Sequence, residues 1–133
     1  MPVITIVLSG RQLSLLQQQE LQRTTTRLIE EIMGKRPSVT AVMVQSLPSA
    51  NWAIGGKALN EHLRAAQVDI TITAGTNTAE EKAGMIDAIH QMLNDRVGPL
   101  AEASYVVIHE EAADAWGYAG LTQQSRQQMR QLI

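Results

Sequence analysis

The chain has 133 residues, of which 44% are apolar and 18% are charged, and it contains no cysteine. A formal net charge of −2 offers no positive surface for nucleic acid or anionic lipid, and the absence of cysteine excludes disulfides, thiolate catalysis and thiolate-bound metal. No apolar run reaches the roughly 18 residues of a membrane-spanning helix, and the N-terminus lacks a signal-peptide pattern. We therefore expect a cytoplasmic protein, one compact domain or two half-domains, with no nucleic-acid or membrane partner.

The first half of the sequence has the strand, helix, strand order of a βαβ unit. Residues 1–8 are rich in β-branched side chains and end at a Ser-Gly pair, which predicts a strand closed by a turn. Apolar residues then recur at helical spacing as far as Gly34, and Ser14 with Gln17 forms a capping-box pattern. Residues 39–44 predict a second strand, parallel to the first.

A turn-rich segment links this unit to a second one. Residues 48–56 contain Trp52 and two adjacent glycines, and residues 57–66 predict a short helical stretch. That stretch would hold His62. The segment ends the first of two units that we place at residues 1–66 and 67–133.

The second unit repeats the first with a period of about 65 residues. Residues 68–73 and 104–108 predict strands, and between them a capping box of Thr78 and Glu81 opens a helix over about 79–97 that holds His90. The internal match is clearest where Asn51-Trp52-Ala53-Ile54-Gly55-Gly56 aligns with Ala115-Trp116-Gly117-Tyr118-Ala119-Gly120. A Gln-rich helix over 121–133, with Thr122 as its N-cap, is expected to be solvated or to pack on a neighbour.

These elements predict an α/β (α+β) fold in which two tandem βαβ units form a four-stranded sheet backed by two helices. Two helices cannot cover both faces of such a sheet, so one face is left without a helical cover. Burying it against identical faces in a closed ring is the simplest solution, and we expect a symmetric homo-oligomer.

Pro2 is the first candidate for a chemical role. Proline after the initiator favours removal of Met1, which leaves a secondary amine at the start of a strand. An α-amino group titrates near about 7.7–8.0, and burial lowers its pKa because the charged form is disfavoured. The sequence thus predicts a general base near neutral pH, although proline at this position is also common in proteins that make no use of it.

Three further residues give Pro2 a context. Arg11 follows the first strand and lies about 30 Å from Pro2 by strand rise, so it would share a site only from an adjacent unit or chain; otherwise it is a solvated turn residue. Trp52 would exclude water from the amine or pack on its own unit. His109 closes the fourth strand as a possible polar site residue. No metal-ligand spacing occurs among the histidines.

The order of these features resembles the 4-oxalocrotonate tautomerase family. The resemblance is carried by Pro2 opening a strand, Gly10-Arg11 closing it, and Trp52 followed by Ile54-Gly55-Gly56. The second half, with its stretches over 105–110 and 113–118, looks like a second copy, so the chain is similar to the fused members of that superfamily. The resemblance implies that three chains build a homotrimer.

The resemblance also implies a reaction that needs no cofactor. Pro2 would act as general base on a 2-hydroxydienoate or enol, Arg11 would bind a carboxylate of this small-molecule substrate, and Trp52 and its counterpart Trp116 would line the site. The family's short members carry a second Arg near the start of the second strand, which neither copy has here. Tyr105 is the candidate hydrogen-bond donor in its place. We expect one site per chain, because the second half begins at an internal peptide nitrogen.

Two alternatives stay open. A hydratase-type dehalogenase or decarboxylase would use the protonated Pro2 amine together with a carboxylate that activates water, and Glu110, Glu111 or Asp114 could supply it. The other is a non-catalytic trimeric binding module, which retention of Met1 would favour.

Overall fold

A computed structural model describes residues 1–60 and 62–132. The first unit contains β1 (Val3–Ser9), α1 (Leu15–Met33), η1 (Pro37–Val39), β2 (Ala41–Leu47), η2 (Ser49–Asn51), β3 (Ala53–Ile54) and β4 (Lys57–Ala58). The second contains β5 (Ala66–Thr73), α2 (Ala79–Val97), β6 (Tyr105–Glu111), β7 (Gly117–Tyr118), β8 (Leu121–Thr122) and α3 (Gln123–Gln131). None of the helices in these ranges is long and apolar enough to cross a membrane.

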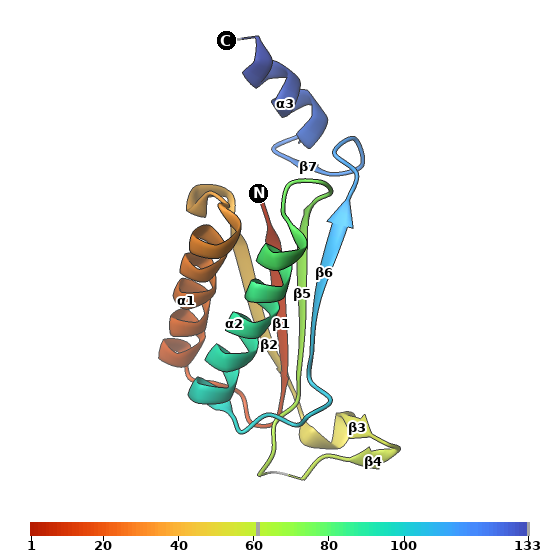
Figure 1. Cartoon of the computed structure of the whole chain (residues 1–133). Helices are drawn as coiled ribbons and strands as arrows, with labels where there is room; N and C mark the ends of the chain where they lie inside the picture. Colours follow the sequence, from red (N-terminus) through yellow and green to blue (C-terminus); the bar gives the residue numbers. More distant parts are fainter. Residues whose placement is uncertain (61, 133) are drawn as a thin grey trace.

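The main sheet has the strand order β2-β1-β5-β6. Each unit contributes a parallel pair, β1 with β2 and β5 with β6, and the two pairs meet where β1 runs antiparallel to β5. Figure 1 shows α1 and α2 lying side by side over one face of this sheet. The predicted fold of two tandem βαβ units with two backing helices is confirmed.

Both long helices begin where the capping patterns predict. Ser14 and Gln17 exchange backbone and side-chain hydrogen bonds of 3.1 and 2.9 Å, and Thr78 and Glu81 do the same at 3.1 and 2.8 Å. Each box satisfies two backbone N–H groups that the first turn of a helix leaves without partners. Gly34 ends α1 in the left-handed conformation, with a φ of 70°.

The core lies between the two helices and the sheet. Every second residue of β1 and β5 is fully buried on the helical side. These strand residues are Ile4, Ile6, Leu8, Val68, Ile70 and Ile72, and they form one cluster with Leu21, Ile29, Met85, Ile89 and Leu93 of the helices. Burial of each large apolar side chain contributes about 1.5–3 kcal/mol. The strand residues on the opposite face have no helix over them, as expected.

The predicted helix over residues 57–66 is wrong. Gly55 and Gly56 adopt φ angles of 62° and 80°, which reverse the chain so that Ile54 pairs with Lys57 in the β3–β4 hairpin. The N–H of Leu59 then donates to Trp52 O at 2.9 Å, so this part of the backbone is bonded to the hairpin. His62 consequently lies in a turn, whereas His90 lies in α2 as predicted.

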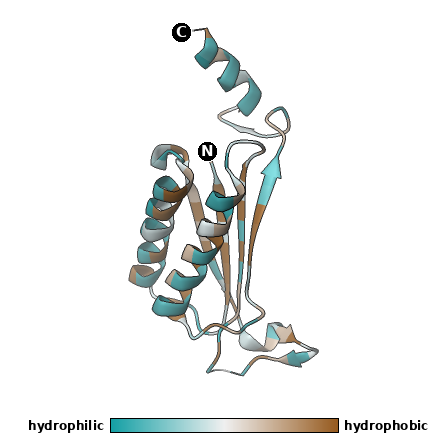
Figure 2. Cartoon of the chain, in the orientation of Figure 1, coloured by the Kyte–Doolittle hydropathy of each residue, from teal (hydrophilic) through white to brown (hydrophobic). Residues whose placement is uncertain are grey.

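The C-terminal helix projects beyond the sheet. Figure 1 shows α3 past the end of the sheet at which β1 begins, and Figure 2 shows that it is predominantly hydrophilic. Thr122 caps it as predicted, accepting a hydrogen bond of 3.0 Å from the N–H of Ser125. Its first residue, Gln123, donates from its N–H to Trp116 O at 3.0 Å, so the helix is anchored to the segment that carries β7 and β8.

Candidate functional site

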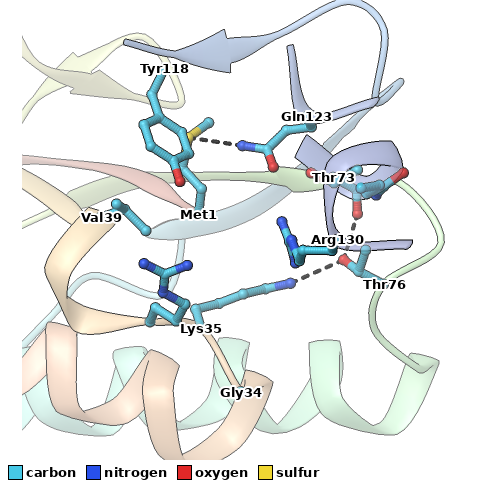
Figure 3. A pocket seen from close by; sticks show the side chains of 11 residues that line it. Met1, Gly34, Lys35, Val39, Thr73, Thr76, Tyr118, Gln123 and Arg130 are labelled. Atoms are coloured by element: carbon cyan, nitrogen blue, oxygen red, sulfur yellow. Dashed lines mark hydrogen bonds between the residues drawn. The ribbon is translucent and has the colours of Figure 1, made fainter. Parts of the chain in front are cut away.

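The start of the chain opens into a pocket of about 170 Å³. The antiparallel register pairs Val3 with Thr71, which brings the start of β1 next to the end of β5 and the turn after it. The pocket is lined by Met1, by residues 34–36 and Val39 after α1, by Thr73 and Thr76 after β5, and by Tyr118, Gln123, Gln127 and Arg130 of the C-terminal segment. Both units therefore build it, and Figure 3 shows how these side chains converge.

Positive charge surrounds the N-terminal amine. Lys35 and Arg36 come from the turn after α1, and Arg130 comes from the last turns of α3. None of the described residues that line the pocket is acidic. Burial first, and then the charges of Lys35, Arg130 and Arg36, lower the pKa of the Met1 amino group from 8.0 to about 6. An amine at this place is thus largely neutral at pH 7.

Lys35 is held in position by the turn of the second unit. Its Nζ donates to Thr76 Oγ1 at 3.0 Å, and the Thr76 hydroxyl donates to Thr73 O at 2.6 Å (Figure 3). Burial lowers the pKa of Lys35, and the nearby charge of Glu81 opposes that change. This lysine therefore reaches the pocket as a partly desolvated cation, which binds an anion more strongly than a fully hydrated one.

The Met1 side chain itself occupies part of the pocket. Gln123 Nε2 donates to the Met1 sulfur at 2.9 Å, and the next residue, Pro2, is buried. The carbonyl of Pro2 accepts a hydrogen bond of 3.2 Å from the N–H of Ala41, which fixes the start of β1 beside β2. Loss of Met1 would accordingly both free the Pro2 amine and widen the cavity in front of it.

The aromatic side chain of the pocket is Tyr118, which the sequence did not single out as a site residue. Its ring packs under the Arg126 guanidinium, 3.7 Å from Cζ to the ring centroid, and its carbonyl accepts a hydrogen bond of 2.9 Å from the same side chain. Trp116 stands nearby, donating from Nε1 to Thr73 Oγ1 at 3.1 Å. Of the two predicted tryptophans, only Trp116 therefore lies beside this pocket.

Arg11, Trp52 and Tyr105 lie toward the other end of the sheet. Arg11 follows the end of β1, Trp52 precedes the β3–β4 hairpin, and Tyr105 begins β6. The possibility that Trp52 folds over the amine of its own chain is wrong, because the antiparallel meeting of the units places the first hairpin at the end away from Met1 (Figure 1). Their predicted part in substrate binding would require a second copy of the chain and stays a prediction.

His109 lies on the sheet face that carries no helix. Its Nε2 is 2.7 Å from Asp69 Oδ1 on the neighbouring strand, and the two side chains are 44% and 37% exposed. It does not line the N-terminal pocket. Its role as a site residue also stays a prediction.

The sequence analysis missed Lys35, Arg36, Tyr118 and Arg130. One signal for Tyr118 was available, because it falls within the internal match to residues 51–56. The antiparallel contact between the units turns that match into an exchange, since the second hairpin serves the first strand. The three cations carry no comparable signal, because they come from a turn and from a polar helix outside the repeated strands.

Comparison with known proteins follows the same division into two units. The model of the family described as "Tautomerase enzyme" matches the chain over residues 2–62 and 67–131. The protein named "Probable tautomerase K2" of Dickeya dadantii (strain 3937) is 30% identical over 61 residues, which are 46% of this chain and 91% of the relative.

Two solved structures have the same fold. Pt0534 inactivated by 2-oxo-3-pentynoate matches with a TM-score of 0.82 at 17% identity, covering 93% of this chain and 98% of its own. A fused 4-OT described as a symmetric trimer matches with a TM-score of 0.81 at 18% identity and the same coverage. Identities this low indicate a shared fold and leave the chemistry to the pocket.

Proposed function

Since the chain belongs to the tautomerase family, we propose that it is a cofactor-independent isomerase that uses the Pro2 amine as general base on an enol-type carboxylate. The observation that carries this proposal is the pocket at the start of the chain, where burial and three cations lower the pKa of an amine to about 6. A base with a pKa just below the working pH is mostly unprotonated and still accepts a proton readily.

The proposed step is a proton transfer within one substrate. The neutral amine of Pro2 takes the proton of the enol hydroxyl, the oxygen becomes a carbonyl, and the electron pair moves to the far carbon of the double bond. The protonated amine then delivers a proton to that carbon, so the base is regenerated and no atom is gained or lost. The cations around the amine stabilise the negative charge that develops on the substrate oxygen.

In this proposal the substrate carboxylate is held by cations of the same pocket. Lys35, Arg36 and Arg130 occupy the surroundings in which the sequence analysis had expected Arg11 from elsewhere. A guanidinium binds a carboxylate through two parallel N–H···O bonds, and an ammonium attracts it as a point charge. The absence of acidic residues from the described lining favours isomerisation over water addition, which would need a carboxylate to activate the water.

Ketonisation of phenylenolpyruvate tests the proposal, followed by absorbance and compared with turnover of 3-chloroacrylate. We expect the processed protein to ketonise phenylenolpyruvate and Pro2→Ala to lose at least about 100-fold in kcat/KM, the usual contribution of a general base. Intact mass must show that Met1 is absent from both proteins. Retention of Met1 in the isolated protein, or full activity of Pro2→Ala, would defeat the proposal, and preferred turnover of 3-chloroacrylate would move it to the dehalogenase class.

We also propose that three chains associate through the sheet face that has no helix. The outward-facing residues of this face include Val3, Val7, Met43 and Val107, and Met43 is 52% exposed. Exposed apolar groups gathered on one face are typical of an interface. The related fused 4-OT is a symmetric trimer, and a closed ring of three would cover the face in every copy.

A further inference from the structure

A second hollow lies at the opposite end of the same sheet. Its volume is about 770 Å³, and Gly10, Arg11, Pro48, Ser49, Ala50, His62 and Arg64 line it. The β3–β4 hairpin extends from the same end of the molecule (Figure 1). None of these residues lines the pocket at Met1, so the two sites are separate.

The hollow is lined by hydrogen-bond donors and positive charge. Arg11 and Arg64 supply two guanidinium groups, His62 an imidazole and Ser49 a hydroxyl, and no acidic side chain is found among the described lining residues. Arg64 is half-buried, and burial and the charge of Arg11 lower its pKa. Two like charges that face one cavity are costly in the empty protein, and an oxyanion between them removes that cost.

Arg64 is fixed more firmly than a solvated surface arginine. Its Nη1 donates to Ser9 O at 3.2 Å, its N–H donates to Pro99 O at 3.2 Å, and its carbonyl accepts from Ala101 N at 2.7 Å. Gly10, at a φ of 101°, turns the chain so that Arg11 follows on the same side, and a side chain at Gly10 would lie 3.8 Å from Arg64 Nη1. The guanidinium therefore loses little freedom when it binds a ligand.

The internal duplication explains what this second site lacks. At the N-terminal end, an amine meets the turn Gly75-Thr76, which brings no arginine. At the other end, the turn Gly10-Arg11 meets residues 64–66, where the chain continues as an ordinary peptide and offers no amine. One end of the duplicated sheet thus carries the base, and the other carries paired arginines.

From this arrangement we infer that the hollow at Arg11 and Arg64 is an accessory binding site for a small oxyanion, a carboxylate or a phosphate, that is held there without being converted. Two guanidinium forks suit the oxygen atoms of either group. The inference does not depend on the proposed reaction, because it uses no residue of the amine pocket.

Isothermal titration calorimetry with malonate and with inorganic phosphate, at constant ionic strength, tests the inference on the full-length protein. We expect saturable binding of at least one probe to wild type and to Pro2→Ala, and binding at least about tenfold weaker in Arg11→Gln and Arg64→Gln, since a hydrogen bond to a charged group contributes about 1.5–3 kcal/mol. The tighter probe identifies the class of anion. Arg27→Gln, which removes an exposed charge from α1, is the matched control and should bind as wild type does.

Three results would overturn the inference. The first is no saturable binding of either probe below about 10 mM, an affinity weaker than about 3 kcal/mol. The second is binding that survives Arg11→Gln, a substitution of an exposed side chain that leaves the fold intact, as circular dichroism would verify. The third is binding that disappears in Arg130→Gln alone, which would place the anion in the amine pocket.

Discussion

Replacement of Lys35 by glutamine tests the electrostatics of the amine pocket most directly. An amine with a pKa of 8.0 is about 10% neutral at pH 7, whereas one with a pKa of about 6 is about 90% neutral. The surroundings of the amine therefore raise the reactive fraction about ninefold. Lys35 is the largest of the three charges that lower this pKa, and only burial contributes more.

We expect Lys35→Gln to raise the pKa of the Pro2 amine, because one of the charges that disfavour its protonation is removed. Activity requires the neutral amine, so kcat/KM rises with pH through this pKa, and the acid limb of the profile should move to higher pH. Arg130→Gln should move it in the same direction by less, and Lys57→Gln, a lysine exposed on β4, should leave it in place.

Two measurements separate this effect from substrate binding. The pH profile of kcat/KM for phenylenolpyruvate reports the free enzyme, and NMR titration of ¹⁵N-proline reports the amine with no substrate present. At pH values well above the pKa, the ionisation effect vanishes and only an increase in KM from the lost cation should remain. An acid limb and a proline titration that are both unchanged in Lys35→Gln would refute the electrostatic reasoning.

Two further substitutions test the hairpin wall and the sheet face. Gly117→Ala would place a Cβ 1.9 Å from Leu121 O, so we expect the β7–β8 hairpin to distort, stability to fall by about 1–3 kcal/mol in urea denaturation and kcat/KM to fall with it, whereas Gly84→Ala in the open middle of α2 should stabilise by up to about 1 kcal/mol; equal effects of the two would contradict the steric argument. Val107→Asp buries a charge in the proposed trimer interface and should yield the mass of a single 14.6 kDa chain in sedimentation, with Arg27→Asp unaffected; a trimer in both variants would place the interface elsewhere.

The parts of the fold that depend on local physics were predictable from the sequence. Ser14 with Gln17 and Thr78 with Glu81 satisfy backbone groups within four residues, so both helix starts lie where those patterns indicate. The segment after Gly56 failed because it contains helix-forming residues but follows two glycines in the left-handed conformation, and the hairpin closed by those glycines takes its hydrogen bonds. Tertiary pairing overrode local propensity there.

The site depends on which ends of the two units meet, and no local pattern encodes that. The duplication was visible in the sequence, but the antiparallel contact of β1 with β5 was not, and this contact decides that Tyr118 rather than Trp52 stands beside the amine. The cations of the pocket follow from the same contact, because it brings the turn after α1 and the polar helix α3 to one place. A polar helix such as residues 123–131 reads only as solvated when its neighbour is unknown.

The antiparallel seam between the units makes each half incomplete in a specific way. The first half holds the amine, but the side chains that enclose it from Thr73 onward belong to the second half. A chain cut after the first unit would keep its nucleophilic nitrogen in open water. Conversely, joining this first half to the second half of a related fused chain would leave the base in place and exchange the surrounding walls, so substrate preference is expected to follow the C-terminal half of such a chimera.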